Sequence, residues 1–493
     1  MRDLLLILIV FGSLPIIFVR PHYGVYMWAW LTYMTPHRLA WGFAYDFRFN
    51  YIVAIITLIA VLRAKETKIR IPLTLPSILW MLFVCWTTLT AANAFEPGTA
   101  WQEWDRFLKI QVMVLVTYVL IKEKEQLIIL VGVIAFSIGF FGVKGGLFTL
   151  LRGGYFRVMG PEYSFIADNN TFALALNMVL PLSLYFMHTT KHYIVRLALL
   201  GVNFLCIMAI FGSYSRGGLV GLTAMGVVFW ITSRNKIISL VIIIVLVPSS
   251  IMMMPEKWVL RVTPMIESLN LPFLKEAMNF NPTSVLSYDS QTELSLKKNA
   301  IIPLTESESL IRKDAEILQD LSVMGRFDAW AVARAIAADR PFLGGGFGAF
   351  TQGTFNHYTP GVYFHDAHSI YFEVLGEQGY AGLIIWVLMH LTSLNYGRWV
   401  IMRCRKDPEL YWASVMAKML ILGLLGYYGA GFSLGLAYYD LPYHYLAILI
   451  ILRLHVQDVL NIRKKIDQKT KKNFLSNRVG HMFPVPPKND RKI

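Results

Sequence analysis

The chain has 493 residues, of which 56% are hydrophobic and 16% charged, and its mean hydropathy is +0.50. These values exclude an ordinary soluble globular protein and predict that a membrane is the solvent for most of the chain. The net charge of +15 is concentrated at the end, since ten Lys and Arg against three Asp after Val456 give +7. Beside a membrane helix, such a tail favours a topology anchor on anionic membrane lipids over a nucleic-acid-binding arm.

The cysteines and the first apolar segment indicate no special processing. Cys85, Cys206 and Cys404 are far apart, and the first two lie in apolar stretches, so neither a disulfide framework nor a cysteine metal site is predicted. The segment from Leu4 to Val19 lacks a following small-residue cleavage site and continues into apolar sequence. We therefore expect it to be retained rather than removed as a signal peptide.

Apolar windows of about 20 residues cover nearly the whole chain, as expected of membrane-spanning helices. The predicted segments are 4–19, 22–36, 49–63, 74–92, 108–121, 127–150, 169–188, 194–213, 216–233, 237–254, 369–396, 412–435 and 438–455. We favour a total of twelve spans, in which the first two segments form one span with a re-entrant piece; the alternative is thirteen separate spans.

Lys and Arg residues in the short loops set the predicted orientation, because they collect on the cytoplasmic side of bacterial membrane proteins. The basic clusters are 63–70, 122–124, 191–196, 234–236, 398–406 and the tail. Segment 255–368 and the connections 152–168 and 213–216 then lie on the outer face. The same parity places the N-terminus outside.

Four regions follow from this pattern. They are an N-terminal transmembrane bundle (1–254), a periplasmic loop (255–368), C-terminal transmembrane helices (369–456) and a basic cytoplasmic tail (457–493). Within the loop, the mixed polar stretch 279–313 predicts a mobile insertion. An amphipathic helix is expected near 323–340, where Phe327 and Trp330 recur at helical spacing and Pro341 stops the helix. We expect it to lie on the membrane or to cap a cavity.

Arg216 begins a predicted span within the sequence SYSRGG. An arginine at the edge of a span commonly anchors the helix to lipid headgroups. Alternatively, Gly217 and Gly218 would expose backbone N–H groups beside the guanidinium at a helix N-terminus. That combination suits a phosphate or a pyrophosphate and needs no metal.

Two further arginines are predicted on the outer face. Arg326 starts the amphipathic helix, where it is either simply solvated or shares the helix start with an anion, because a lone arginine there opposes the helix dipole. Arg157, in the connection 152–168, is a third candidate for the same negative ligand. Asn170, near the start of the next span, is a possible polar partner.

The sequence HDAH places His365 and His368 three residues apart. The pair could form half of a metal site, but the further ligands would have to be Asp366 and Glu373, so we predict no metal. His368 could instead cap the span that follows it, or act as a general base, since the pKa of histidine lies near neutral pH. The run Gly344 to Gly348 is a weak nucleotide signal, because no strand precedes it.

Three blocks in order resemble a known family. His368 and Ser369, nine residues, Gly379, two residues and Gly382 are similar to the extracytoplasmic histidine motif of O-antigen ligases. SYSRGGLVGL and GRFDAWAVARAIAADRPFLGGGFGAF resemble the two arginine-bearing blocks of the wider O-antigen ligase and polymerase superfamily. MRDLLLILIVFGSLP and YMTPHRLAWGFAYDF further resemble a subgroup described as exosortase-A-associated O-glycosylation ligases.

The resemblance implies an all-α, GT-C-like polytopic membrane protein of about 12 transmembrane helices with one long, partly helical periplasmic loop. It also implies a metal-independent, inverting glycosyltransferase of the bacterial inner membrane, without a cofactor. The donor would be a glycan on undecaprenyl pyrophosphate and the acceptor lipid A-core. His368 would be the general base, and Arg216, Arg326 and Arg157 would bind the pyrophosphate, with His365, Asn170 and Gly217 as secondary candidates.

Three alternatives remain open at this point. A polymerase of the same superfamily would use a growing glycan as acceptor, and a protein O-oligosaccharyltransferase would use Ser or Thr of a protein. A lipid-linked glycan transporter is the alternative without enzymatic activity, but no paired broken helices with matching intramembrane charges are apparent in the sequence. The segment 279–313 and the basic tail depart from the family pattern.

Overall fold

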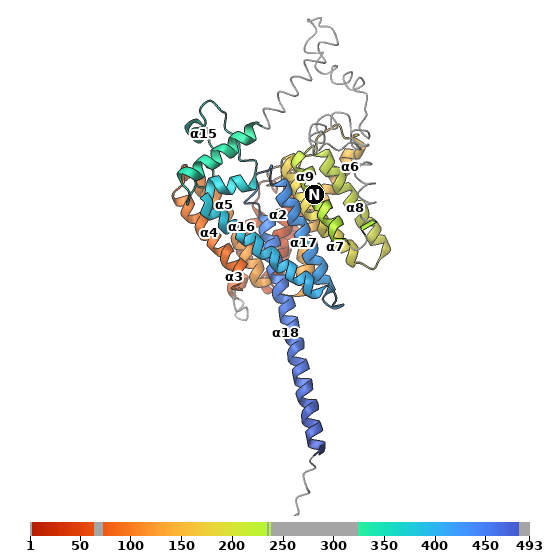
Figure 1. Ribbon diagram of the computed structural model, residues 1–493. Helices are drawn as coiled ribbons and strands as arrows, with labels where there is room; N and C mark the ends of the chain where they lie inside the picture. The colour runs from red at the N-terminus through yellow and green to blue at the C-terminus, as the bar shows by residue number, and fades with distance from the viewer. Residues whose placement is uncertain (1, 64–71, 234–235, 238–323, 483–493) are drawn as a thin grey trace, which may run out of the picture.

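The computed structural model describes residues 2–63, 72–233, 236–237 and 324–482, and these ranges contain helices and no strand (Figure 1). The helices are α1 (Arg2–Val19), α2 (His22–Met34), η1 (Pro36–Leu39), α3 (Phe49–Arg63), α4 (Leu75–Ala92), α5 (Pro97–Leu120), α6 (Lys124–Leu151), α7 (Asn169–Thr189), α8 (Tyr193–Gly212), α9 (Arg216–Thr232), a helix of residues 324–339, α15 (Gln352–Tyr358), α16 (Ile370–Cys404), α17 (Tyr411–Ala430) and α18 (Asp440–Met482). The predicted segment 237–254 and the insertion 279–313 lie outside the described residues.

Eight of the described helices are long and apolar enough to cross a membrane, and α3 and α9 are shorter apolar helices. The all-α, polytopic fold class is therefore confirmed. Two predicted boundaries differ clearly from the structure. Helix α5 begins at Pro97 rather than near 108, because its first half carries charges that hide it from a hydropathy window. Helix α18 continues to Met482, so the predicted tail begins inside a helix that projects from the bundle (Figure 1).

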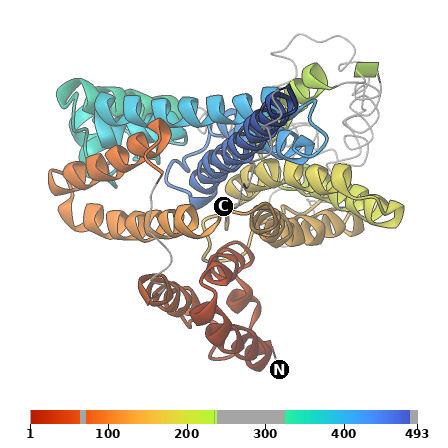
Figure 2. The ribbon, with the colours of Figure 1, turned by 90° about the horizontal axis from the view of Figure 1, so that it is seen from below.

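Helices α1, α2 and α3 form a group at one edge of the bundle (Figure 2). We expected α1 and α2 to form one span with a re-entrant piece, but they are separate helices that run in opposite directions. Asp3 lies at the start of α1, and its carboxylate accepts a hydrogen bond from the N–H of Ala44 at 3.2 Å. Tyr26, near the start of α2, donates to the carbonyl of Gln126 at the other end of the bundle, at 3.3 Å. Since α2 has only 13 residues, it is shorter than a full span.

The basic turns described by the structure meet at one end of the bundle, which we name the basic face. His455 contacts the carbonyl of Lys122 at 3.0 Å, and His188 contacts the hydroxyl of Tyr411 at 3.3 Å. These contacts join the start of α6 to the middle of α18 and the end of α7 to the start of α17. The basic turn 122–124, the end of α7 before the basic turn 191–196, and the start of α17 after the basic turn 398–406 carry these contacts.

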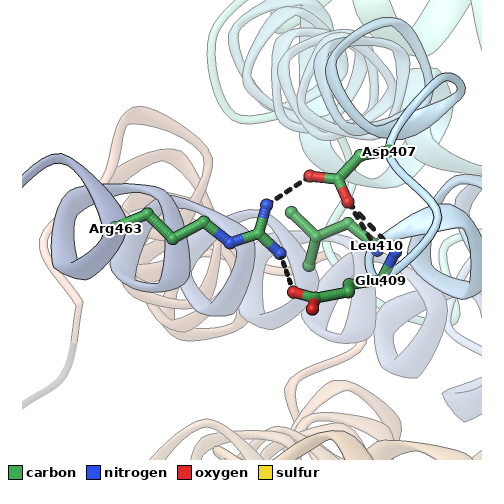
Figure 3. Close-up of polar contacts among 4 residues, drawn as sticks. All are labelled: Asp407, Glu409, Leu410 and Arg463. Atoms are coloured by element: carbon green, nitrogen blue, oxygen red, sulfur yellow. Dashed lines mark hydrogen bonds and ion pairs between the residues drawn. The ribbon is translucent and has the colours of Figure 1, made fainter. Parts of the chain in front are cut away.

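An ion-pair cluster fixes α18 at the basic face (Figure 3). The Arg463 guanidinium donates to Asp407 and to Glu409, each at 2.5 Å. The other oxygen of Asp407 accepts from the backbone N–H groups of Glu409 and Leu410, at 3.0 and 3.3 Å. One guanidinium thus holds the projecting helix to the turn that precedes α17.

The opposite end of the bundle, which we name the loop face, gathers connections that are far apart in the sequence. The N–H of Val158 donates to Gly212, and the Asn169 side chain donates to Ser213. The helix of residues 324–339 also lies on this face, since Arg340, just after its end, donates to the carbonyl of Asn93 at 2.7 Å. The loop face therefore brings together the three blocks that carry the candidate residues.

The glycine run 344–348 is a packing element. The N–H of Gly345 donates to Gly376 and that of Gly348 to the carboxylate of Glu377, both at 2.8 Å. Helix α16 is kinked at Gly379, whose φ of +67° suits glycine. A Cβ on Gly344 would lie 2.6 Å from the backbone nitrogen of Gly379. These glycines let the chain after helix 324–339 approach the kink closely, which explains the run without a nucleotide.

Candidate active site

His368 sits in a strained backbone position just before α16. Its φ is +43°, which a residue with a side chain rarely adopts, at a cost on the order of 1–3 kcal/mol. Ser369 occupies the N-cap position of α16, and the N–H of Ile370 donates to the carbonyl of Gly431 at 2.9 Å. The prediction that His368 caps the helix is therefore wrong. The hydrogen bond from Ile370 to Gly431 instead fixes the backbone that follows His368.

Trp330, on the helix of residues 324–339, holds the histidine loop in place. Its indole N–H donates to the carbonyl of Ala367 at 2.9 Å. Its ring stacks on Phe372, with centroids 4.9 Å apart, and meets the edge of Phe432 at 5.3 Å. The helix therefore packs on residues that precede and follow His368 in the sequence. Its expected place on the membrane or over a cavity stays a prediction.

Arg216 and Arg326 come from different helices and lie close enough to affect one another. Burial lowers the pKa of Arg326, and the positive charge of Arg216 lowers it further. Both side chains are half-buried. Within the described ranges, neither guanidinium has a hydrogen bond or an ion pair. Two unpaired positive charges at one place favour the binding of an anion.

The electrostatic surroundings of His368 favour its neutral form. Burial is the largest influence and lowers its pKa below the usual 6.5. The carboxylates of Asp366 and Asp168 raise the pKa, whereas Arg326 and His365 lower it. At neutral pH the imidazole is therefore unprotonated and able to accept a proton. These charged groups come from the loop before α7, helix 324–339 and the loop before α16, so the three segments meet near His368.

The start of α9 differs from the prediction. The N–H of Gly218 donates to the Ser215 hydroxyl at 3.0 Å, so it is not exposed for a phosphate as we expected. Gly217 is buried, and a Cβ on it would lie 2.6 Å from the Ser433 hydroxyl oxygen. Glycine is needed here because α9 packs against the segment that joins α17 to α18. The anion-binding capacity of this turn therefore rests mainly on the Arg216 guanidinium.

Arg157 and Asn170 lie on the loop face but at the periphery of the cluster. The backbone beside Arg157 is fixed to the end of α8 through Val158, and the arginine side chain is exposed. Asn170 is in the first turn of α7, where its N–H donates to Asp168 at 2.7 Å. The structure places both near the α8–α9 turn, and no described contact joins either of them to His368.

His365 packs against the start of helix 324–339. A Cβ on Gly325 would lie 2.8 Å from its Nε2, so a larger residue at 325 would displace the imidazole. His365 thus contacts the residue directly before Arg326. In the described part of the chain, no group of three or more His, Cys, Asp or Glu side chains is placed to hold a metal ion.

Two acidic residues near His368 were not singled out as catalytic candidates. Asp168 caps α7 and also acts on the charge of His368. Glu373 is one turn into α16 and accepts from the N–H of Ala437 at 2.9 Å. The sequence ADNN predicts Asp168 as an N-cap residue. Because Asp168 lies 200 residues before His368, the sequence does not indicate that the two side chains are close.

Residues 201–387 match the family model described as O-antigen ligase. Arg216, Arg326 and His368 all fall within this match. Residues 201–387 thus form a domain of the O-antigen ligase superfamily. In addition to this O-antigen ligase domain, residues 1–191, from α1 to the end of α7, match a family of unknown function (DUF5935). A search of curated proteins found no match. The resemblance to the exosortase-A-associated subgroup stays a prediction.

Proposed function

We propose that the protein transfers a glycan from undecaprenyl pyrophosphate to lipid A-core at the periplasmic face of the bacterial inner membrane. The main support is that His368, whose burial favours the neutral form, lies near Arg326, and Arg326 in turn lies near Arg216. Both arginine side chains are half-buried, and neither has a partner among the described residues. The basic turns collect at the opposite end, and basic turns are cytoplasmic in bacterial membranes. The loop face is therefore the periplasmic one.

The proposed reaction is a single displacement with inversion at the anomeric carbon. His368 accepts the proton of an acceptor hydroxyl while that oxygen attacks the anomeric carbon. The bond between this carbon and the pyrophosphate oxygen breaks, and undecaprenyl pyrophosphate leaves with the electron pair. A positioned base contributes about a hundred- to ten-thousandfold in rate.

Arg216 and Arg326 carry the other half of the mechanism. Negative charge grows on the pyrophosphate as the bond breaks, and guanidinium groups bind such oxygens with two parallel hydrogen bonds. The two positive charges replace the metal ion that a diphosphate leaving group often needs. Arg157 and Asn170 would contact more distant parts of the donor, His365 would support Arg326, and Gly217 would allow α9 to pack.

The test is complementation of a strain that lacks the gene. We would compare wild type with His368→Ala and Arg216→Ala, and use His357→Ala as matched control, because His357 is an exposed histidine of α15. Lipid-linked glycan and glycan on lipid A-core are both quantified at equal protein level. Both site variants should accumulate the donor and lose modified lipid A-core, while the control transfers normally.

Normal transfer by both site variants would overturn the assigned roles. Glycan found on Ser or Thr of a protein would identify a protein O-oligosaccharyltransferase that uses the same residues. Longer glycan chains on the polyprenyl carrier, lost in the variants, would identify a polymerase. Loss of the donor from the periplasmic side without any change in acceptor would favour a transporter.

A further inference from the structure

A cavity of about 450 Å³ opens on the loop face, and His368 is not among its lining residues. It lies between α2, η1, the start of α3, the loop 163–166 and the first residue of α18. At its rim Tyr163 is 75% exposed, whereas at its floor Thr35 is 8% exposed and Asp440 fully buried. The volume falls in the range of small-molecule sites, so the cavity can hold a ligand of sugar size.

Several buried polar atoms in this cavity lack partners. The hydroxyl of Thr35, Nδ1 of His37 and Nε of Arg38 make no hydrogen bond. Neither carboxylate oxygen of Asp440 reaches a side-chain partner. Leaving one such group unsatisfied costs about 1–3 kcal/mol, so the unpaired atoms of Thr35, His37 and Arg38 mark a polar cavity wall that suits a polar ligand.

Aromatic rings and arginines alternate around the opening. The guanidinium of Arg38 lies 4.6 Å from the ring of Tyr45 and 4.8 Å from that of Tyr163. Arg106 lies 4.0 Å from the ring of Phe165. Of these rings Tyr163 is exposed, and an exposed aromatic ring can also pack against the apolar face of a sugar ring.

The charges of the cavity favour an anionic ligand. Arg38, Arg48 and Arg106 line it together with two carboxylates, Asp46 and Asp440, which leaves one positive charge in excess. Arg38 is already paired with Asp46 at 3.0 Å, and Arg106 lies 3.8 Å from a carboxylate outside the cavity. Arg48 is exposed and has no ion pair among the described residues.

The cavity and the candidate active site share two walls. Residues 163–166 line the cavity, and Asp168, two residues further on, acts on the charge of His368. On the other side, Ala437 binds Glu373 close to His368, and Tyr439 and Asp440 line the cavity. A molecule in the cavity is therefore a neighbour of the reaction centre.

We propose that this cavity binds the acceptor saccharide through a carboxylate or phosphate that the saccharide carries. Arg48 binds the negative group, and the exposed ring of Tyr163 contacts the sugar ring. This inference rests on the proposed glycosyl transfer and adds to it the chemical class of the acceptor. The site belongs largely to residues 1–191, outside the O-antigen ligase match.

Binding of small probes tests the ligand class directly. Full-length protein in lipid nanodiscs is titrated with glucose 6-phosphate, glucuronate, glucose and inorganic phosphate, followed by saturation-transfer NMR. The two anionic sugars should bind at least tenfold more tightly than glucose or phosphate alone. Arg48→Gln should weaken them about tenfold, whereas Arg152→Gln, an exposed arginine of the loop face outside the cavity, should not. Equal binding of phosphate alone, or no binding of any probe, overturns the proposal.

Kinetics separate this inference from the proposed function. In the transfer reaction, Arg48→Gln should raise the KM for acceptor about tenfold and leave the KM for donor unchanged. A rise in donor KM instead would assign the cavity to the donor and refute the acceptor assignment. If the wild-type protein binds anionic sugars but transfers no glycan, the proposed function fails while the ligand class of the cavity stands.

Discussion

Replacing Arg326 by glutamine should make the folded protein more stable and the enzyme much less active. The two guanidinium groups of Arg216 and Arg326 repel one another in the absence of a ligand. At an effective dielectric constant of about 20, two like charges at short range near a protein surface repel by on the order of 1–4 kcal/mol. Because both side chains are partly exposed, solvent screening reduces the expected gain to about 0.5–1 kcal/mol.

The loss of activity should be larger than this gain in stability. A charge-assisted hydrogen bond contributes about 1.5–3 kcal/mol, so kcat/KM for the donor should fall about 10- to 150-fold. Thermal unfolding and donor turnover are measured on the same nanodisc preparation. Arg334→Gln is the matched control, because Arg334 is an exposed arginine two turns further along the same helix.

Two results would refute this reasoning. If Arg326→Gln melted at a lower temperature than wild type, the arginine would have a structural partner that supports the fold. If Arg334→Gln reduced turnover as strongly as Arg326→Gln, the loss would reflect the helix surface rather than an anion bound between the two arginines.

Three further predictions follow from the same contacts. Trp330→Phe keeps the ring stack but removes the hydrogen bond to Ala367, so kcat should fall about tenfold at constant acceptor KM, as steady-state kinetics would show. Because burial lowers the pKa of His368, kcat/KM for the donor should fall with acidification only below pH 6.5. In the complex, the negative charge of bound pyrophosphate opposes the effect of Arg326 and raises the pKa of His368. The kcat profile, measured between pH 5 and 8, should therefore bend at a higher pH than the profile of kcat/KM. Arg463→Ala removes an exposed ion pair on the basic face and should leave transfer unchanged in the complementation assay.

The spans were readable from the sequence because a bilayer allows few other solutions for apolar segments. The first half of helix α5 was not predicted. Asp105 and Lys109 form an ion pair one turn apart there, and such charged turns give no signal in a hydropathy window. The polar C-terminal extension of α18 was not predicted for the same reason. Its polar residues continue a helix that the membrane rule does not require.

The candidate site could be predicted only in part from the sequence. Arg216, Arg326 and His368 could be assigned to one face from topology alone, and the structure brings their segments together. The hydrogen bond from Trp330 to Ala367 joins residues 37 apart in the sequence, and no local pattern predicts it. The left-handed backbone of His368 was not predicted either. The cavity lined by Arg48 was not predicted, because its lining is divided among five separate segments of the sequence.

The two faces of the bundle use arginine in physically different ways. At the basic face Arg463 is shared by two carboxylates, and Asp407 is in turn fixed by backbone N–H groups (Figure 3). At the loop face Arg216 and Arg326 approach one another, and no described carboxylate pairs with either. Two arginines that merely anchored helices to lipid headgroups would gain nothing from this approach, because each headgroup can be reached separately. A single ligand that carries two negative charges, such as a pyrophosphate, gains from both arginines at once, so their proximity favours the binding role of Arg216 over the anchoring role.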